Sequence, residues 1–182
     1  MTVAALLRTV ADTLDAARIP YMVVGSFASS FHGEPRTTQD LDVVIDPDPP
    51  ALEILLSSLP ARFYVDADVA RDALARRGMF NVIDPDTGWK IDLIIRKARP
   101  FSVAELARRE KATIAGVDVF IASAEDTVVA KLEWAKQGGS ARQLDDVRRL
   151  LRIQLGTLDQ AYVVQWVRAL GLDAEWADAS AD

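Results

Sequence analysis

Hydrophobic positions along the chain follow two periods, one typical of helices and the other of strands. Helical spacing of apolar residues, together with capping residues, predicts helices over residues 1–18, 27–31, 50–59, 69–77, 102–111, 123–137, 140–155 and 157–171. The expected N-terminal caps include Thr2, Ser123 and a capping box formed by Ser102 and Glu105. Apolar or alternating runs predict strands over residues 21–24, 40–46, 79–83 and 89–95, a short strand or loop at 63–65, and a hairpin or bent strand over 113–121. The last third is therefore entirely helical, and its acidic, alanine-rich tail, residues 172–182, is expected to fray at its end.

The length of the chain limits the number of domains. It has 182 residues, half of them hydrophobic, which suits one compact domain or a domain with a small helical appendage. The change from mixed to purely helical patterning predicts an α/β core over residues 1–122 and a helical portion packed on it over residues 123–182.

The rest of the chain is organised around a strand, a tight turn and a short helix near the N-terminus. The apolar run at residues 21–24 is typical of a buried strand and stops at Gly25 and Ser26. Ser26 is a favourable N-cap, so the helix over residues 27–31 is expected to begin there.

Two carboxylates follow at the start of the next strand. Alternate residues of a strand share a face, so Asp40 and Asp42 point one way while Leu41 and Val43 point the other. Neighbouring carboxylates repel each other unless a cation lies between them, and magnesium prefers oxygen ligands. The alternative is that Asp40 is a turn residue and Asp42 a solvated strand position; the Asp-x-Asp pattern taken alone favours this alternative.

A third aspartate lies in the hairpin predicted over residues 79–95, whose turn is residues 84–88. Asp92 has apolar neighbours on both sides, and burying a lone carboxylate is unfavourable. The cost disappears if Asp92 reaches the same cation as the aspartates of residues 40–46. The alternative is an edge-strand residue paired with Lys90.

This arrangement resembles the nucleotidyltransferase superfamily, which is built on the palm of polymerase beta. The Arg-x-Thr before the aspartates makes it more similar to the small bacterial group that includes the AbiEii-type toxins. The resemblance covers roughly residues 20–150 and rests on Gly25, Ser26, Arg36, Thr38, Asp40 and Asp42. It implies an α/β fold in which helices flank a small mixed sheet and a helical C-terminal portion closes the cleft.

The resemblance also implies a reaction, namely transfer of a nucleoside monophosphate from an NTP to an acceptor hydroxyl or phosphate. Asp40, Asp42 and Asp92 would be the catalytic residues and would bind two Mg²⁺ ions. Asp92, or another carboxylate near the acceptor, could take the proton. The acceptor is left open between a tRNA end, a protein hydroxyl and a small molecule.

The nucleotide would be held by a second set of residues. Gly25 would let the backbone approach the phosphates, and Ser26 with the following helix N-terminus would donate N–H groups to them. Arg36 and Lys131 would offset phosphate charge, and Thr38 belongs to the same nucleotide-binding motif.

Lys131 lies among apolar residues of a predicted helix, where an isolated ammonium is unfavourable. A nucleotide phosphate would be a sufficient partner, and the AbiEii-type group carries a similar lysine. The alternative, a surface lysine whose stem lies along the core, is equally favoured. Asp146 resembles the last acidic motif of that group and would orient Lys131 or a basic neighbour, while Gln143 stands where another aspartate is expected.

Composition narrows the partners and the compartment. The net charge of −6 disfavours binding to long nucleic acid, and the lack of cysteine excludes disulfides and favours the cytoplasm. No apolar run approaches the roughly 20 residues that a membrane span needs, and no signal peptide is expected. An antitoxin or a second copy of the chain is the expected protein partner. The competing hypothesis is a catalytically inactive, antitoxin-like module that binds a nucleotide or a partner.

Overall fold

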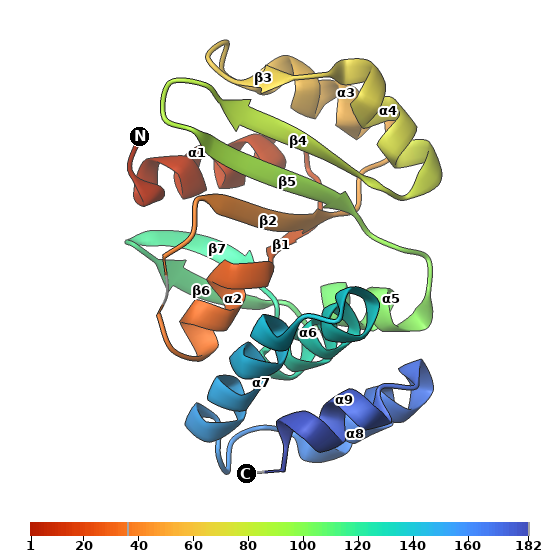
Figure 1. Cartoon of the computed structure of the whole chain (residues 1–182). Helices are drawn as coiled ribbons and strands as arrows, with labels where there is room; N and C mark the ends of the chain where they lie inside the picture. The colour runs from red at the N-terminus through yellow and green to blue at the C-terminus, as the bar shows by residue number, and fades with distance from the viewer. Residues whose placement is uncertain (36, 182) are drawn as a thin grey trace.

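The computed structural model describes residues 1–35 and 37–181, and a single sheet organises them (Figure 1). Its seven strands lie in the order β3-β4-β5-β2-β1-β7-β6. The strands are β1 (Tyr21–Val23), β2 (Asp40–Ile45), β3 (Tyr64–Val65), β4 (Met79–Asp84), β5 (Trp89–Ile95), β6 (Glu110–Ile114) and β7 (Val117–Ile121). The helices are α1 (Val3–Ala16), α2 (Gly25–His32), α3 (Pro49–Ser58), α4 (Ala67–Arg76), α5 (Pro100–Ala107), α6 (Ala124–Gly138), α7 (Ala141–Ile153), α8 (Gln160–Leu170) and α9 (Asp173–Ala179). The predicted α/β class and mixed sheet are confirmed.

The sheet is mixed because its central strands run in both directions. β2 pairs in parallel with β5 and antiparallel with β1, and β1 pairs in parallel with β7. Burial alternates along β2, where Leu41, Val43 and Ile45 are fully buried and the intervening residues are not. This period of two places the apolar side chains of β2 on one face and its aspartates on the other.

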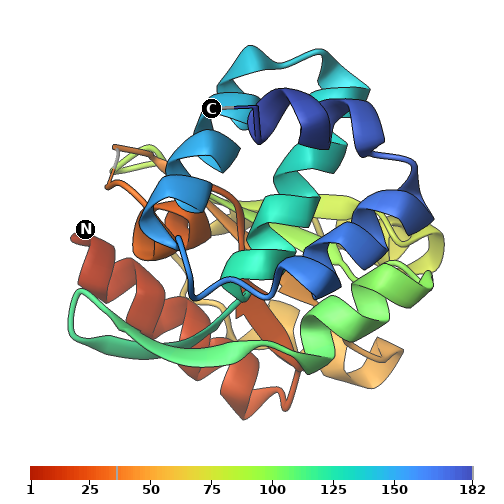
Figure 2. The same cartoon turned by 90° about the horizontal axis from the view of Figure 1, so that it is seen from below.

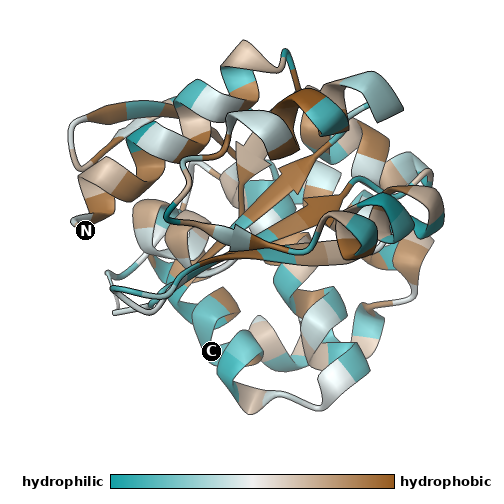
Figure 3. Ribbon diagram, turned by 90° about the horizontal axis from the view of Figure 1, so that it is seen from above, coloured by the Kyte–Doolittle hydropathy of each residue, from teal (hydrophilic) through white to brown (hydrophobic). Residues whose placement is uncertain are grey.

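The apolar face of the sheet carries the main hydrophobic core. Side chains of α1, α3 and α4 pack there against β1, β2, β4, β5 and β7. The strands in the middle of the molecule are strongly hydrophobic, whereas the helices around them are mixed in colour (Figure 3). The opposite face is covered only in part, by a small cluster of Met22, Leu106 and Ala122.

The C-terminal helices build a second hydrophobic cluster. α6 lies between α5, α7, α8 and α9, and the buried side chains of all five helices pack together (Figure 2). Phe101 of α5 belongs to this cluster, so the second cluster includes a residue that precedes the predicted boundary at residue 122. The division into residues 1–122 and 123–182 stays a prediction.

Some local expectations about where helices begin and end are wrong. α2 begins at Gly25 with Val24 as its N-cap, so Ser26 lies inside the first turn and does not cap the helix. α5 begins at Pro100, because proline is already set for the first helical position, and the Ser102 hydroxyl accepts a hydrogen bond from Arg99 Nε instead of capping. α5 also ends at Ala107, earlier than expected, and the chain enters β6.

Within the acidic tail, whose end is expected to fray, the segment Asp173–Ala179 forms α9, because its aromatic and aliphatic residues have a surface to pack on. Ala179 is buried, and Trp176 packs against the second cluster. No helix in residues 1–35 and 37–181 combines the length and the apolar character needed to cross a membrane.

Candidate functional site

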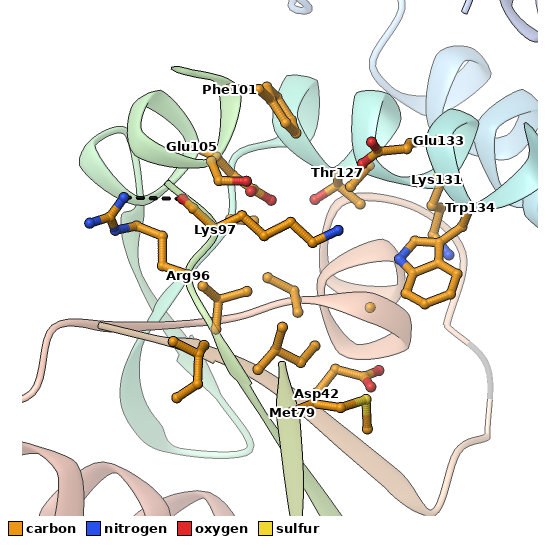
Figure 4. Close-up of a pocket in the computed structure, with 18 of the residues that line it drawn as sticks. Asp42, Met79, Arg96, Lys97, Phe101, Glu105, Thr127, Lys131, Glu133 and Trp134 are labelled. Atoms are coloured by element: carbon orange, nitrogen blue, oxygen red, sulfur yellow. Dashed lines mark hydrogen bonds between the residues drawn. The ribbon is translucent and has the colours of Figure 1, made fainter. Parts of the chain in front are cut away.

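A cavity of about 460 Å³ separates the polar face of the sheet from the C-terminal helices (Figure 4). Its sheet side is formed by the Gly25–Ser26 turn and by residues of β2, β4 and β5. Its helix side is formed by α5 and α6 and by the basic segment that joins β5 to α5. Of the sequence-predicted site residues, those that line this cavity are Gly25, Ser26, Asp42 and Lys131.

The parallel pairing of β2 and β5 brings the three aspartates to one region of the sheet. Asp42 lies directly beside Asp92 in the register, and Asp40 lies beside Lys90. Because paired residues of adjacent strands project from the same face, the side chains of Asp40, Asp42 and Asp92 share the polar face. Their roles as catalytic residues and metal ligands stay predictions.

Lys90 lies between two of these carboxylates. Its Nζ is 3.1 Å from Asp92 Oδ2 and 3.7 Å from Asp40 Oδ1. Asn81 Nδ2 donates to Asp92 Oδ1 at 2.5 Å. The alternative prediction for Asp92, an edge-strand residue paired with Lys90, is therefore right about the pairing and wrong about the strand. β5 is an interior strand, flanked by β4 and β2.

Of the three aspartates, Asp42 is the one that lines the cavity, and its pKa is perturbed. Burial raises the pKa of Asp42, and the negative charges of Asp92 and Asp40 raise it further. Lys90 and a hydrogen bond from the backbone N–H of Ser26 oppose these effects. The carboxylates therefore repel one another in the absence of an added cation, as expected for a site that accepts positive charge.

The Gly25–Ser26 turn lies directly against Asp42. Gly25 has a φ of +63°, and a Cβ placed on it would lie 2.0 Å from Asp42 Oδ2. Only glycine fits this position, because it tolerates the left-handed conformation and leaves room for the carboxylate. The turn and the aspartate thus form one compact unit at the N-terminus of α2.

Lys131 is buried and is bound by protein groups. Its Nζ donates to Asp146 Oδ2 at 2.7 Å and to Gln143 Oε1 at 3.0 Å, and both acceptors come from α7. The surface-lysine alternative is wrong, since the side chain is only 6% exposed. Asp146 does contact Lys131 as the sequence suggested, and it neutralises the ammonium that a phosphate was expected to neutralise.

The remaining two nucleotide-binding candidates lie outside the cavity or outside the described residues. Thr38 Oγ1 accepts a hydrogen bond from the Asp40 backbone N–H at 3.2 Å and holds the entry to β2. It does not line the cavity. Arg36 lies outside the residues that the structure describes.

The helix side of the cavity holds polar groups that the sequence did not reveal. Arg99 Nη2 donates to Glu133 Oε2 at 2.6 Å and ties α6 to the start of α5. Glu105 is buried beside this pair, and burial raises its pKa to about 8. Figure 4 shows Glu105 and Lys97 on the α5 side of the cavity and Lys131 and Trp134 on the α6 side. Only a helical wheel of α6 could have signalled Trp134, which follows Lys131 by three residues.

The aspartates of β2 and β5 can be compared with the ligands that Mg²⁺ requires. Across residues 1–35 and 37–181, no group of three or more His, Cys, Asp or Glu side chains is gathered as a metal cage. The expected three-carboxylate cluster is therefore not formed, since Lys90 binds Asp40 and Asp92. Mg²⁺ in nucleotide sites commonly takes one or two carboxylates and completes its shell with water and phosphate oxygens. Asp42 and Asp92, adjacent and mutually repelling, fit that requirement.

Solved structures share this fold across nearly the whole chain. The antibiotic-resistance factor ANT(2'')-Ia superposes with a TM-score of 0.60 at 17% identity over 96% of this chain and 93% of its own. A nucleotidyltransferase-like protein of Paracoccidioides brasiliensis gives a TM-score of 0.57 at 19% identity over 94% and 90% of the two chains. The lincosamide adenylyltransferase LnuA, with lincomycin bound, gives 0.54 at 11% identity over 84% and 98%.

The comparisons place the fold among nucleotidyltransferases. No protein-family model matches the sequence, and no curated protein matches it. The identities are too low to carry over an activity, so the likeness shows the fold alone.

Proposed function

We propose that this protein is a magnesium-dependent nucleotidyltransferase that transfers a nucleoside monophosphate from an NTP to an acceptor, with release of pyrophosphate. One observation carries the proposal. The Gly25–Ser26 turn at the start of α2 lies against Asp42 in one cavity, with Asp92 beside it in register. The nucleotidyltransferase fold supports the same class of reaction.

Some residues of the cavity would bind the phosphates of the NTP, and others would supply or hold charge near them. The N-terminus of α2 offers backbone N–H groups to the phosphates, and Gly25 allows a close approach. Asp42 and Asp92 would hold Mg²⁺, with Asp40 beside them. When bound, Mg²⁺ would supply positive charge to the triphosphate and would lower the pKa of the acceptor hydroxyl. Lys97, which extends into the cavity, supplies positive charge near the leaving pyrophosphate (Figure 4).

The acceptor is the open part of the proposal. One structure of ANT(2'')-Ia contains adenylyl-2''-tobramycin, and LnuA is a lincosamide adenylyltransferase. These comparisons favour a small molecule over tRNA or a protein hydroxyl, and a cavity of about 460 Å³ is in the range of small-molecule sites. The toxin role, the antitoxin partner and the cytoplasmic location remain predictions from the resemblance to AbiEii-type proteins.

The competing hypothesis is a binding module without catalysis. Retention of Asp40, Asp42 and Asp92 on one sheet face argues against it. Asp42 and Asp92 lie side by side, and Lys90 offsets their repulsion only in part. A module that only binds a nucleotide has no need of this pair, since it disfavours phosphate unless a metal cation is present.

The test is labelled transfer combined with thermal unfolding. The protein is incubated with each α-labelled NTP and Mg²⁺, together with total tRNA or a small-molecule fraction of a cell extract. We expect label on one acceptor class, and a Tm that Mg²⁺ and NTP raise only together. Absence of both effects for all NTPs would refute the proposal.

Asp42→Asn is the matching variant. We expect it to abolish transfer and the Mg²⁺-dependent rise in Tm, while its own Tm holds or increases because carboxylate repulsion is relieved. Asp86→Asn, in the exposed β4–β5 turn, is the control and should behave as the parent.

A further inference from the structure

Trp134 is an exposed indole at the wall of the cavity. Its exposed fraction is 60%, whereas the other three tryptophans are partly buried. A large apolar ring that protrudes into a cavity offers a flat face to a ligand. Met79, 46% exposed on β4, enters the same cavity from the sheet side, so the indole has an apolar counterpart (Figure 4).

The helix that carries Trp134 is fixed on both sides of it. Lys131 is bound to Asp146 of α7, and Glu133 is bound to Arg99 before α5. The ring is therefore presented by an element that is already tied to its neighbours, which lowers the entropy lost when a ligand binds.

Gln137 extends this wall by one further turn. Lys131, Trp134 and Gln137 follow one another at intervals of three residues and all line the cavity. The six residue steps from Lys131 to Gln137 span about 9 Å along the helix axis. Gln137 is exposed, and among the described residues no hydrogen bond occupies its side-chain amide. The amide offers one donor and one acceptor side by side.

We propose that Trp134 and Gln137 form the base-binding wall for the NTP and that the wall selects adenine. The indole stacks on the base, Met79 covers the other side, and the Gln137 amide accepts from the adenine N6 amino group and donates to N7. Adenine presents this donor–acceptor pair and guanine presents two acceptors on the same edge, so an amide discriminates between them. The inference rests on the proposed function, because it assumes that the phosphates lie at the Gly25–Ser26 turn.

Calorimetric titration of the full chain with Mg·ATP and Mg·GTP tests whether the base-binding wall selects adenine. We expect the parent to bind ATP more tightly than GTP, and Trp134→Ala to raise the Kd for ATP roughly 10- to 100-fold, the range of base–aromatic stacking. Trp134→Phe should retain most of the affinity. Gln137→Leu should bring the ATP and GTP affinities close together.

Tyr64→Ala is the matched control, because Tyr64 is an equally exposed aromatic residue, at 62%, and does not line the cavity. Its Kd should equal that of the parent. Unchanged ATP affinity in Trp134→Ala would overturn the inference and leave the proposed function standing. If the parent binds no NTP in the presence of Mg²⁺, the proposed function itself fails.

Discussion

Glu105 is a glutamate side chain with an unusual environment. It is buried on the α5 side of the cavity, and no hydrogen bond or ion pair reaches its carboxyl among the described residues. Burial raises its pKa to about 8, and the negative charges of Asp126 and Glu133 add to this while Arg99 and Lys97 oppose it. At neutral pH the group therefore holds its proton inside the folded protein.

This proton makes the stability of the protein depend on pH. The pKa of Glu105 is higher in the folded than in the unfolded state, so its contribution is complete below the ordinary glutamate range and is lost as pH rises to about 8. Glu105→Gln, which mimics the protonated form, should match the parent at pH 5. At pH 9 it should exceed the parent by a few kcal/mol in unfolding free energy.

Denaturant titrations at the two pH values measure the difference. Glu110→Gln is the control, since Glu110 is exposed on β6. Parallel pH profiles for the parent and Glu105→Gln would show that the carboxyl ionises freely and would contradict the prediction.

Variants of Lys131 test how much its buried ion pair with Asp146 contributes to stability. Lys131→Met would leave the carboxylate of Asp146 buried without its ammonium, and removing one partner of such a pair typically costs about 3–5 kcal/mol. The double variant Lys131→Met with Asp146→Leu should recover much of this loss, because no charge remains buried. Urea unfolding of the two variants decides the matter; a loss below about 0.5 kcal/mol for the single variant is what a surface lysine would give.

At the scale of elements, the start of α2 is the most constrained segment. Gly25→Ala places a methyl group 2.0 Å from Asp42 Oδ2 at a φ of +63°, so the turn or the carboxylate must move. We expect a loss of about 1–3 kcal/mol in stability and loss of the joint Mg²⁺ and NTP effect on Tm.

Gly88→Ala is the matched control for this turn. Gly88 has a similar φ, +73°, but a Cβ on it meets nothing within 4 Å. Gly88→Ala should therefore lose only the stability that the backbone strain costs, and it should bind nucleotide as the parent does. Equal loss of nucleotide binding in both variants would remove the special role of the Gly25 turn.

Elements were predictable where local patterning agrees with the tertiary structure. Burial alternates along β2, and β5 alternates between apolar and polar residues before it ends in three apolar ones. The Thr2 and Ser123 side chains cap α1 and α6. α5 was misplaced because Ser102 and Glu105 match a capping box by spacing, while Pro100 starts the helix and Glu105 turns into the interior.

The site was predictable only where its residues are close in sequence. The Gly25–Ser26 turn and the aspartates of β2 lie within one supersecondary unit. The Arg99–Glu133 pair joins residues 34 positions apart, and the burial of Glu105 depends on how α5 docks against α6. No local signal carries such information, because it arises from long-range packing.

At the scale of the whole molecule, polar contacts connect the C-terminal helices to the rest of the chain. Tyr162 Oη of α8 donates to Asp126 Oδ1 at 2.6 Å, and the Arg108 guanidinium lies 4.0 Å from the centre of the Tyr162 ring. Burial raises the pKa of Asp126, while the bonds from Tyr162 and Ser123 and the charge of Arg108 lower it.

Tyr162→Phe should therefore weaken the docking of α8. A hydrogen bond to a charged group contributes about 1.5–3 kcal/mol, and we expect a loss of that size in unfolding free energy. Amide hydrogen exchange should speed up in α8 more than in β2. Uniform acceleration across both elements would indicate global destabilisation without a local effect on docking.

The two walls of the cavity belong to different hydrophobic clusters. The carboxylates and the glycine turn are held by strands packed on α1, α3 and α4, whereas Trp134 and Glu105 are carried by helices of the second cluster. Substitutions in well-separated clusters have nearly additive effects on stability. Substitutions in the helix wall are therefore expected to change the shape and polarity of the cavity without lowering the stability of the strand wall.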